Sequence, residues 1–252
     1  MIKHRYCAIE SLKTMGCAST QAFGSTINIL MWNIFKCKRQ GWQDDFINLM
    51  NNKDLVLLQE AIRNTPFDDY FKNSIQYQWI MASSFKNLKT NIETGVKTGA
   101  NVQSINAYCL ASEPSEPISK TKKMLIATLY PLSTSSEPLL VINAHLINFV
   151  SFQKFRVHLD QVFNTLAEHK GPIVLAGDFN TWNAKRLQYF NKRAISFGLD
   201  EVEMDRQARF NHLYQHLDHI YYRGLTVVKA HVHSDIHSSD HYPISLSLQV
   251  TP

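Results

Sequence analysis

Apolar residues along the chain gather in short runs, most of them the length of a β-strand. Residues 27–35 (INILMWNIF), 55–58 (LVLL) and 172–177 (PIVLAG) are nearly continuous runs of apolar and β-branched side chains, which is typical of buried strands. Further strand-like segments, some with alternating polarity, are 76–83, 94–102, 105–112, 124–132, 137–147, 216–232 and 238–250. Residues 124–132 and 137–147 are expected to pair, and 216–232 to form two strands around the turn Arg223-Gly224.

Helical spacing of apolar positions appears between these strand-like runs. Helices are expected over residues 41–52, 66–76, 152–168 and 184–197. Strands outnumber helices, no repeat recurs at a fixed short period, and no linker divides the chain. The pattern predicts one α+β domain, with two packed sheets and helices outside them, over residues 27–252.

The first 26 residues lack a clear apolar pattern and are expected to be poorly ordered or a surface arm. Charged and polar residues interrupt any apolar core there, so we see no clear signal peptide. No run approaches the ~18 apolar residues of a membrane span. We expect a cytoplasmic protein, with secretion as the open alternative.

Composition adds two constraints. The formal net charge of the 252 residues is +5, which permits an anionic partner without requiring one. The four cysteines form no C-x-x-C pair and no cluster with zinc spacing, which favours free thiols. We expect a monomer without a stable protein partner.

Polar side chains recur at the ends of the apolar runs, where loops on a rigid scaffold carry catalytic residues. They are Asn33, Gln59, Glu60, His145, Asp178, Asn180, Asp218, Asp240 and His241. The oxygens of Glu60, Asp240 and Asn33 are hard ligands of the kind that suits Mg²⁺ or Mn²⁺.

The remaining members of this set suit phosphoryl chemistry. His145 and His241 can contact a phosphoryl group, because an imidazolium donates to a developing oxyanion. Asp178 can orient and deprotonate an attacking water, with Asn180 positioning the same groups. Together the residues predict metal-assisted hydrolysis of a phosphate ester.

Six short motifs, WNIF, LLQE, NAHL, GDFN, LDHI and SDHYP, occur in this order between residues 27 and 248. In them the chain resembles the endonuclease/exonuclease/phosphatase superfamily. More narrowly, it resembles the bacterial YafD-like branch of this superfamily in the longer stretches WNIFK, LVLLQEA, HLINF, GPIVLAGDFNTW and LDHIYYRGL. The resemblance implies a DNase I-like fold: a four-layer α/β/β/α sandwich of two packed mixed β-sheets flanked by helices.

The resemblance also implies roles for residues. Asn33 and Glu60 belong to the metal and phosphate site, and Asp240 helps to hold the metal. Asp178 and Asn180 align the water and the reacting phosphate. The remaining roles fall to His241 at the scissile phosphate, Asp218 as its carboxylate partner, and His145 as the second histidine of the DNase-like and sphingomyelinase-like branches. Glu93 is the guessed carboxylate partner of His145.

Simpler interpretations stand beside these. Asp178 and Asn180 are ordinary turn formers, and Asn33 is a plausible cap for the segment that follows. Because adjacent strand residues point to opposite faces, only one of Asp218 and His219 can face the site, and we choose Asp218. Three basic residues are either phosphate contacts or solvated surface: Lys36, Arg186 and Arg223.

Three functions remain in competition. The leading hypothesis is a Mg²⁺-dependent phosphodiesterase, a nuclease acting on nucleic acid. The second is a phospholipid hydrolase of the sphingomyelinase kind, or an inositol-phosphate hydrolase, with residues 146–152 (LINFVSF) as an apolar loop for a lipid head group. The third is a catalytically silent binding protein, which we rank last because no expected ligand is missing.

Overall fold

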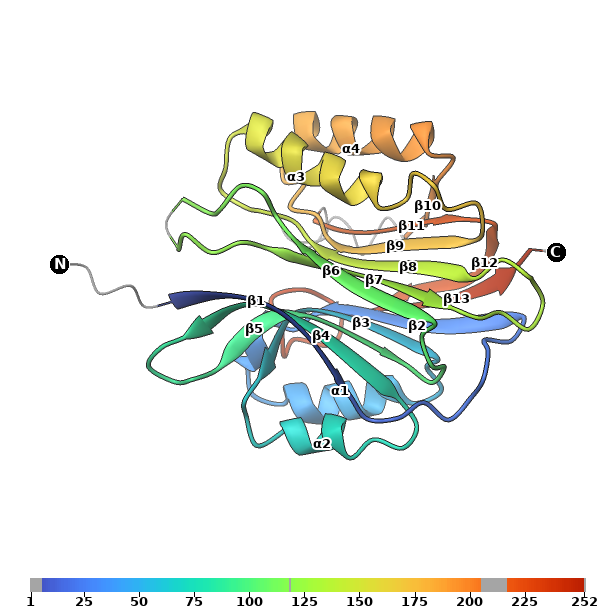
Figure 1. Ribbon diagram of the computed structural model, residues 1–252, viewed down its shortest axis with the longest axis horizontal. Coiled ribbons are helices and arrows are strands. Elements are labelled where there is room, and N and C mark those ends of the chain that lie inside the picture. The colour runs from blue at the N-terminus through green and yellow to red at the C-terminus, as the bar shows by residue number, and fades with distance from the viewer. Residues whose placement is uncertain (1–5, 118, 205–216, 252) are drawn as a thin grey trace.

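The computed structural model describes residues 6–117, 119–204 and 217–251. Two β-sheets pack face to face, and helices cover the outer side of each (Figure 1). The seven-stranded sheet has the order β1 (Tyr6–Met15), β4 (Gln78–Asn87), β5 (Glu93–Ala100), β3 (Leu55–Arg63), β2 (Thr26–Asn33), β13 (Ile244–Val250) and β12 (Leu225–Val232). The six-stranded sheet has the order β10 (Asp200–Glu201), β11 (Asp218–Arg223), β9 (Ile173–Asp178), β8 (Leu139–His145), β7 (Met124–Tyr130) and β6 (Asn106–Ala111).

Among the described residues, four α-helices form the two outer layers. Helices α1 (Trp42–Met50) and α2 (Asp68–Lys72) cover the seven-stranded sheet, and α3 (Phe152–Asn164) and α4 (Ala184–Ser196) cover the six-stranded sheet (Figure 1). Each sheet mixes antiparallel pairs with one parallel pair. This arrangement confirms the predicted four-layer sandwich.

The continuous apolar runs reflect strands that are covered on both faces. In β2, Ile27, Ile29 and Met31 belong to the core between the sheets. Leu30 and Trp32 alternate with them and pack under α1 and α2. Successive side chains on a strand point to opposite faces. Because both faces of β2 are covered, both sets are apolar, and polar and apolar residues do not alternate along the run.

The expectation that residues 1–26 are poorly ordered is wrong for their described part, which forms a strand at the edge of a sheet. Tyr6–Met15 forms strand β1, which pairs antiparallel with β4 at the edge of the seven-stranded sheet. Phe23 is buried in the core between the sheets. Strand β1 is held by backbone hydrogen bonds and its register shifts between Ala8 and Ser11, so it left no clear apolar pattern in the sequence.

Strands β11 and β12 follow each other in the chain, but they lie in different sheets. The turn at Gly224, which has a φ of 67°, carries the chain from one sheet to the other. As a result, β11 and β13 approach the same edge of the sandwich from opposite sheets. Within the described residues, no helix is long and apolar enough to cross a membrane.

Candidate active site

The pairing of strands brings the expected residues to one edge of the sandwich. In the six-stranded sheet, Asp178 at the end of β9 lies opposite both His145 and Asp218. In the seven-stranded sheet, Asn33 at the end of β2 lies opposite Gln59, next to Glu60. Strand ends that are far apart in sequence therefore meet because of register.

A cavity of about 350 Å³ opens at this edge. Its lining includes seven residues expected from the sequence to carry metal or catalytic roles: Asn33, Glu60, His145, Asp178, Asn180, Asp240 and His241. Lys36 also lines it, whereas Asp218 lies behind His241.

Asp178 is the most tightly held carboxylate of the site. Asn33 Nδ2 donates to its Oδ2 at 3.0 Å, the backbone N–H of Asn180 donates to its Oδ1 at 3.0 Å, and His145 Nε2 lies 3.4 Å from Oδ2. Burial raises the pKa of Asp178 to about 7. A carboxylate with a pKa near neutrality is suited to accept a proton at physiological pH.

The glycine before Asp178 is required by close packing of two strands. A Cβ on Gly177 would lie 1.8 Å from the carbonyl oxygen of Ala144 on β8, and the glycine has a φ of 148°. Only a residue without a side chain fits there. The turn interpretation and the site interpretation of GDFN are therefore compatible, since the strand exit places Asp178 and Asn180 at the cavity.

His241 is paired with Asp218, as the family pattern implies. Its Nδ1 lies 2.6 Å from Asp218 Oδ2, and its Nε2 lies 3.9 Å from Asp178 Oδ2. Burial alone would lower the pKa of His241, but Asp218, Asp178 and Asp240 outweigh it and raise the pKa to about 10. His241 is therefore an imidazolium at neutral pH.

Potential metal-ligand atoms of Asp178, Asp218 and His241 lie within 4.8 Å of one another. A protonated imidazole has no free lone pair for a metal. The short contact between His241 and Asp218 is better explained as a charge-assisted hydrogen bond.

His145 has the opposite charge state. Burial lowers its pKa well below the ordinary value, and the positive charges of Lys123 and Lys36 lower it further. The site thus contains one neutral and one protonated histidine. The guessed partner Glu93 is wrong: it lies opposite Arg63 on the neighbouring strand and accepts from Arg63 Nε and Nη2 and from Ser83 Oγ.

Glu60 reaches the cavity because β3 is irregular at this point. The register with β5 shifts between Leu58 and Ala61, and Glu60 has a φ of 51°. Bulges of this kind redirect a side chain, and strained backbone persists only where surrounding structure holds it.

The Glu60 carboxylate is kept ionised by two lysines. Lys36 Nζ lies 2.7 Å from Oε2, and Lys123 Nζ lies 3.9 Å from Oε1. Burial alone would raise the pKa of Glu60, but Lys123 and Lys36 together lower it below the ordinary value. An ionised carboxylate beside the Asn33 amide and the Asp240 carboxylate is a donor set that fits a divalent hard cation.

The loop that carries Asp240 and His241 is fastened to β2. Trp32 Nε1 donates to the carbonyl oxygen of His241, and Ser239 Oγ donates to that of Asn33. Asn33 itself has two contacts, because its Oδ1 also accepts from the backbone N–H of Phe35 at 3.1 Å. Asn33 therefore contacts the backbone of the segment that follows and Asp178 at the same time.

Two of the three expected phosphate contacts are wrong. Arg186 is buried, and its guanidinium donates to the carbonyl oxygens of Asn180 and Val150. Arg223 lies five residues beyond Asp218 along β11, roughly 17 Å at the usual rise of a strand, and donates to the carbonyl oxygens of Phe197 and Gly171. Lys36 alone of the three lines the cavity.

Sequence reasoning missed one side of the site. Lys123 Nζ lies 3.4 Å from Glu116 Oε1, and both line the cavity with Ser119 and Thr121. Lys123 belongs to a basic group in the sequence with Lys120 and Lys122, but nothing in that group indicates which lysine turns inward.

His219 points away from Asp218, as strand alternation predicts. Its Nε2 lies 2.7 Å from Thr181 Oγ1 and its Nδ1 lies 2.8 Å from Glu201 Oε1. Thr181 follows Asn180 directly, so His219 fastens the loop that carries Asp178 and Asn180 from behind.

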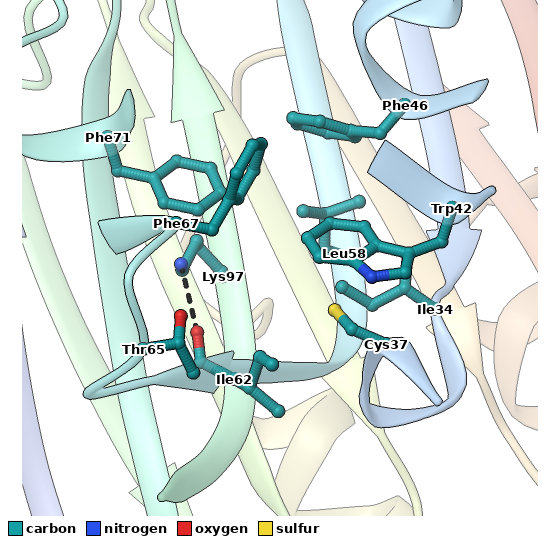
Figure 2. A pocket seen from close by; sticks show the side chains of 10 residues that line it. All are labelled: Ile34, Cys37, Trp42, Phe46, Leu58, Ile62, Thr65, Phe67, Phe71 and Lys97. Carbon is teal, nitrogen blue, oxygen red and sulfur yellow. Dashed lines mark hydrogen bonds between the residues drawn. The ribbon is translucent and has the colours of Figure 1, made fainter. Parts of the chain in front are cut away.

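A second, water-sized cavity lies under the seven-stranded sheet, between the strands and α1 and α2 (Figure 2). Lys97 points into it from β5, donates to the carbonyl oxygen of Ile62 at 3.2 Å, and lies 3.4 Å from the centre of the Phe71 ring. Burial lowers the pKa of Lys97 to about 7. The carbonyl oxygen that accepts from Lys97 belongs to Ile62, two residues after Glu60 on β3.

The match to a known protein family covers most of the chain. The model of the Endonuclease/Exonuclease/phosphatase family matches residues 31–241. The chain belongs to this family. Family members are phosphoric ester hydrolases that generally use a divalent metal ion, so the chain is assigned to this class of enzyme.

Curated relatives agree with the expected bacterial branch. A UPF0294 protein of Vibrio campbellii is 37% identical over 227 residues, which cover 88% of this chain and 77% of the relative. A UPF0294 protein of Yersinia pseudotuberculosis is 34% identical over 224 residues, which cover 88% of this chain and 84% of the relative.

Solved structures show the same fold at low identity. An endonuclease/exonuclease/phosphatase from Beutenbergia cavernae has a TM-score of 0.70 at 15% identity and covers 90% of this chain and 72% of its own. The human nocturnin catalytic domain with bound sulfate has a TM-score of 0.67 at 18% identity, covering 90% and 94%. A mannosyl-6-phosphatase of Bacteroides thetaiotaomicron has a TM-score of 0.64 at 12% identity, covering 88% and 99%.

Proposed function

We propose that this protein is a phosphodiesterase that uses Mg²⁺, with Mn²⁺ as the alternative, and that its substrate is nucleic acid. One observation carries the proposal: a buried carboxylate, Asp178, faces a cavity between a neutral histidine and a protonated one. In such a site, Asp178 would accept a proton and the protonated histidine would stabilise negative charge.

The proposed mechanism is attack of a water on phosphorus with departure of the ester oxygen. Asp178 orients the water and accepts its proton as the water oxygen bonds to phosphorus; the ester P–O bond breaks, its electron pair leaves with the ester oxygen, and that oxygen takes a proton from solvent. The His241 imidazolium, held by Asp218, donates a hydrogen bond to a phosphate oxygen as its negative charge grows. His145 is neutral, so it can donate a hydrogen bond to the phosphoryl group without adding positive charge to the site. Asn180 is fixed by its Nδ2 bond to the carbonyl oxygen of Leu146 at 2.9 Å.

A divalent cation would be held by Glu60, Asp240 and the amide oxygen of Asn33. It would supply positive charge at the phosphate oxygens and leaving group. Lys36 and Lys123 lie on the same side of the cavity and would add charge that attracts an anionic substrate.

The lipid alternative receives less support from the loop that suggested it. Leu146 and Ile147 are fully buried, and Phe149 is the exposed large apolar residue within 146–152. Stable membrane association needs a wider apolar surface than one ring. A silent binding protein would not need the paired carboxylate and histidine states described above.

The proposal is tested by hydrolysis of single-stranded DNA, RNA, plasmid DNA, an abasic oligonucleotide, sphingomyelin and bis(p-nitrophenyl) phosphate, each with Mg²⁺ or with EDTA. We expect cleavage of nucleic acid in Mg²⁺ that EDTA abolishes and Asp178→Ala removes. The matched control is Asp69→Asn, which alters a solvent-exposed carboxylate on α2. Cleavage unchanged in Asp178→Ala would refute the site, and lipid cleavage without nucleic acid cleavage would refute the substrate.

A further inference from the structure

Two exposed aromatic side chains stand at one side of the cavity. Phe149 lines the cavity and is 74% exposed. Trp182 is 53% exposed and follows the loop that carries Asp178 and Asn180. Exposed aromatic rings of this size are costly to leave in water, and a pair beside a polar site suggests a surface for a ligand.

One amide contacts both residues, through the ring of Trp182 and the backbone of Phe149. Asn148 Oδ1 accepts from Trp182 Nε1 at 3.0 Å and from the backbone N–H of Phe149 at 2.8 Å. The backbone N–H of Asn148 in turn donates to Glu116 Oε1 at 3.3 Å. Phe149 has a φ of 52°, which a bulky residue adopts only where surrounding structure holds it.

Trp182 is supported from behind as well. The guanidinium of Arg186 lies 4.6 Å from the centre of its ring, and that guanidinium is held by the carbonyl oxygens of Asn180 and Val150. The guanidinium of Arg186, which is not available to contact phosphate, therefore packs against the Trp182 ring. A ring that is exposed yet held on two sides is pre-organised for contact.

We propose that Phe149 and Trp182, tethered by Asn148, form a stacking site for an unpaired nucleobase next to the phosphodiester that the cavity accepts. This inference rests on the proposed function and adds a substrate class to it: single-stranded nucleic acid. Every base offers a flat face to an aromatic ring, so the site is tolerant of sequence. Bases inside a duplex are already stacked on their neighbours and cannot reach it.

The arrangement favours a base over a lipid tail. Trp182 Nε1 donates to the polar amide of Asn148, and Leu146 and Ile147, which precede this residue in the chain, are buried. Lys36, Lys123, Asn148 and Phe149 line the same cavity, so a phosphate bound there would lie near the aromatic pair. A single strand carries a phosphate beside each base and offers both contacts together.

The experiment compares four variants on matched probes: Phe149→Ala, Trp182→Ala, Trp182→Phe and the control Ile195→Ala, which removes a side chain of similar exposure on α4. The probes are a single-stranded oligothymidylate, the same strand with abasic units, and a duplex of equal length. We expect each alanine variant to raise KM for the oligothymidylate roughly 10-fold with kcat little changed. Trp182→Phe keeps a ring and should retain most of the affinity, and the control should match the wild type.

The abasic strand supplies the second arm. It should bind the wild type roughly 10-fold more weakly than oligothymidylate, and the alanine variants should not weaken it further. Equal KM for the two strands, or a preference for duplex, would overturn the stacking site while leaving Asp178-dependent cleavage intact. Thermal melting of each variant separates lost contacts from lost folding.

A direct binding measurement keeps the stacking site testable if the proposed function fails. Fluorescence anisotropy of labelled oligothymidylate in EDTA reports binding without cleavage. Weaker binding in the two alanine variants and not in Ile195→Ala supports the site. Unchanged binding of oligothymidylate by the two alanine variants would refute the stacking site. Variants that lose binding to sphingomyelin vesicles and keep binding to oligothymidylate would also refute it.

Discussion

Replacing Asp218 with asparagine tests whether the charge on His241 comes from its buried partner. Asparagine keeps an acceptor for His241 Nδ1, which lies 2.6 Å from Asp218 in the wild type, but removes the negative charge. The rise of the His241 pKa from 6.5 to about 10 corresponds to about 5 kcal/mol of preference for the protonated ring. Asp218 is the largest of the groups that favour protonation.

The expected result follows from the sign of this change. In the wild type, the imidazolium persists until the pH rises to about 10. Without Asp218, burial is opposed only by more distant carboxylates, so the His241 pKa should fall to its ordinary value or below it, and the charge should be lost as pH rises through that value. Loss of one donor to a developing oxyanion lowers kcat by on the order of 10²-fold.

The assay is kcat as a function of pH on the best substrate, with the histidine ring signals followed by NMR titration. We expect the ratio of wild-type to Asp218→Asn activity to be small near pH 5.5 and to increase towards pH 8.5. A His241 that titrates above pH 8 in the variant, or a ratio independent of pH, would contradict the electrostatic argument. A thermal melt confirms that the variant is folded.

Three further expectations concern other groups. Asp178→Asn should lower kcat by on the order of 10³-fold, and its melting temperature should be equal to that of the wild type or higher because a buried carboxylate is removed. In the wild type, kcat/KM should fall as the pH drops below about 7, where Asp178 becomes protonated. A fully active Asp178→Asn variant would contradict the role of Asp178 as the base. Glu60→Gln should raise the Mg²⁺ concentration needed for half-maximal activity at least ~10-fold, measured by titration after EDTA treatment, and an unchanged titration would exclude Glu60 as a ligand. Burial lowers the Lys97 pKa from 10.5 to about 7, so at Lys97 the unfolded chain binds a proton between those pH values that the folded chain does not. The raised pKa of His241 has the opposite sign over this range, so the test is a difference: the stability of the wild type relative to Lys97→Met, measured in urea, should rise from pH 7 to pH 10 by a few kcal/mol.

Much of the fold could be predicted, because strands covered on both faces leave long apolar runs and helices leave a clear spacing. Strand alternation also separates Asp218, which contacts His241, from His219, which contacts Thr181. Strand β1 was missed because edge pairing depends on backbone hydrogen bonds, which leave a weak side-chain pattern.

The site was predictable where a residue lies at a strand end, since the carboxyl ends of parallel strands meet at one edge. It was not predictable where direction matters. Arg223 is close to Asp218 in sequence, but an extended strand carries it to the far end of the sheet. Lys123 and Glu93 occupy positions that only pairing and loop geometry determine: Lys123 turns into the cavity, and Glu93 is neutralised by Arg63.

The passage of the chain between sheets at Gly224 has a consequence for when the proposed site is assembled during synthesis. The six-stranded sheet supplies His145, Asp178 and Asp218, whereas Glu60 and His241 come with the seven-stranded sheet. Strand β13, which docks beside β2 and brings His241 with it, is made after every other described strand. On a ribosome, a growing chain can complete the six-stranded sheet and still lack His241, so the proposed site is complete only once synthesis has passed the last described strand.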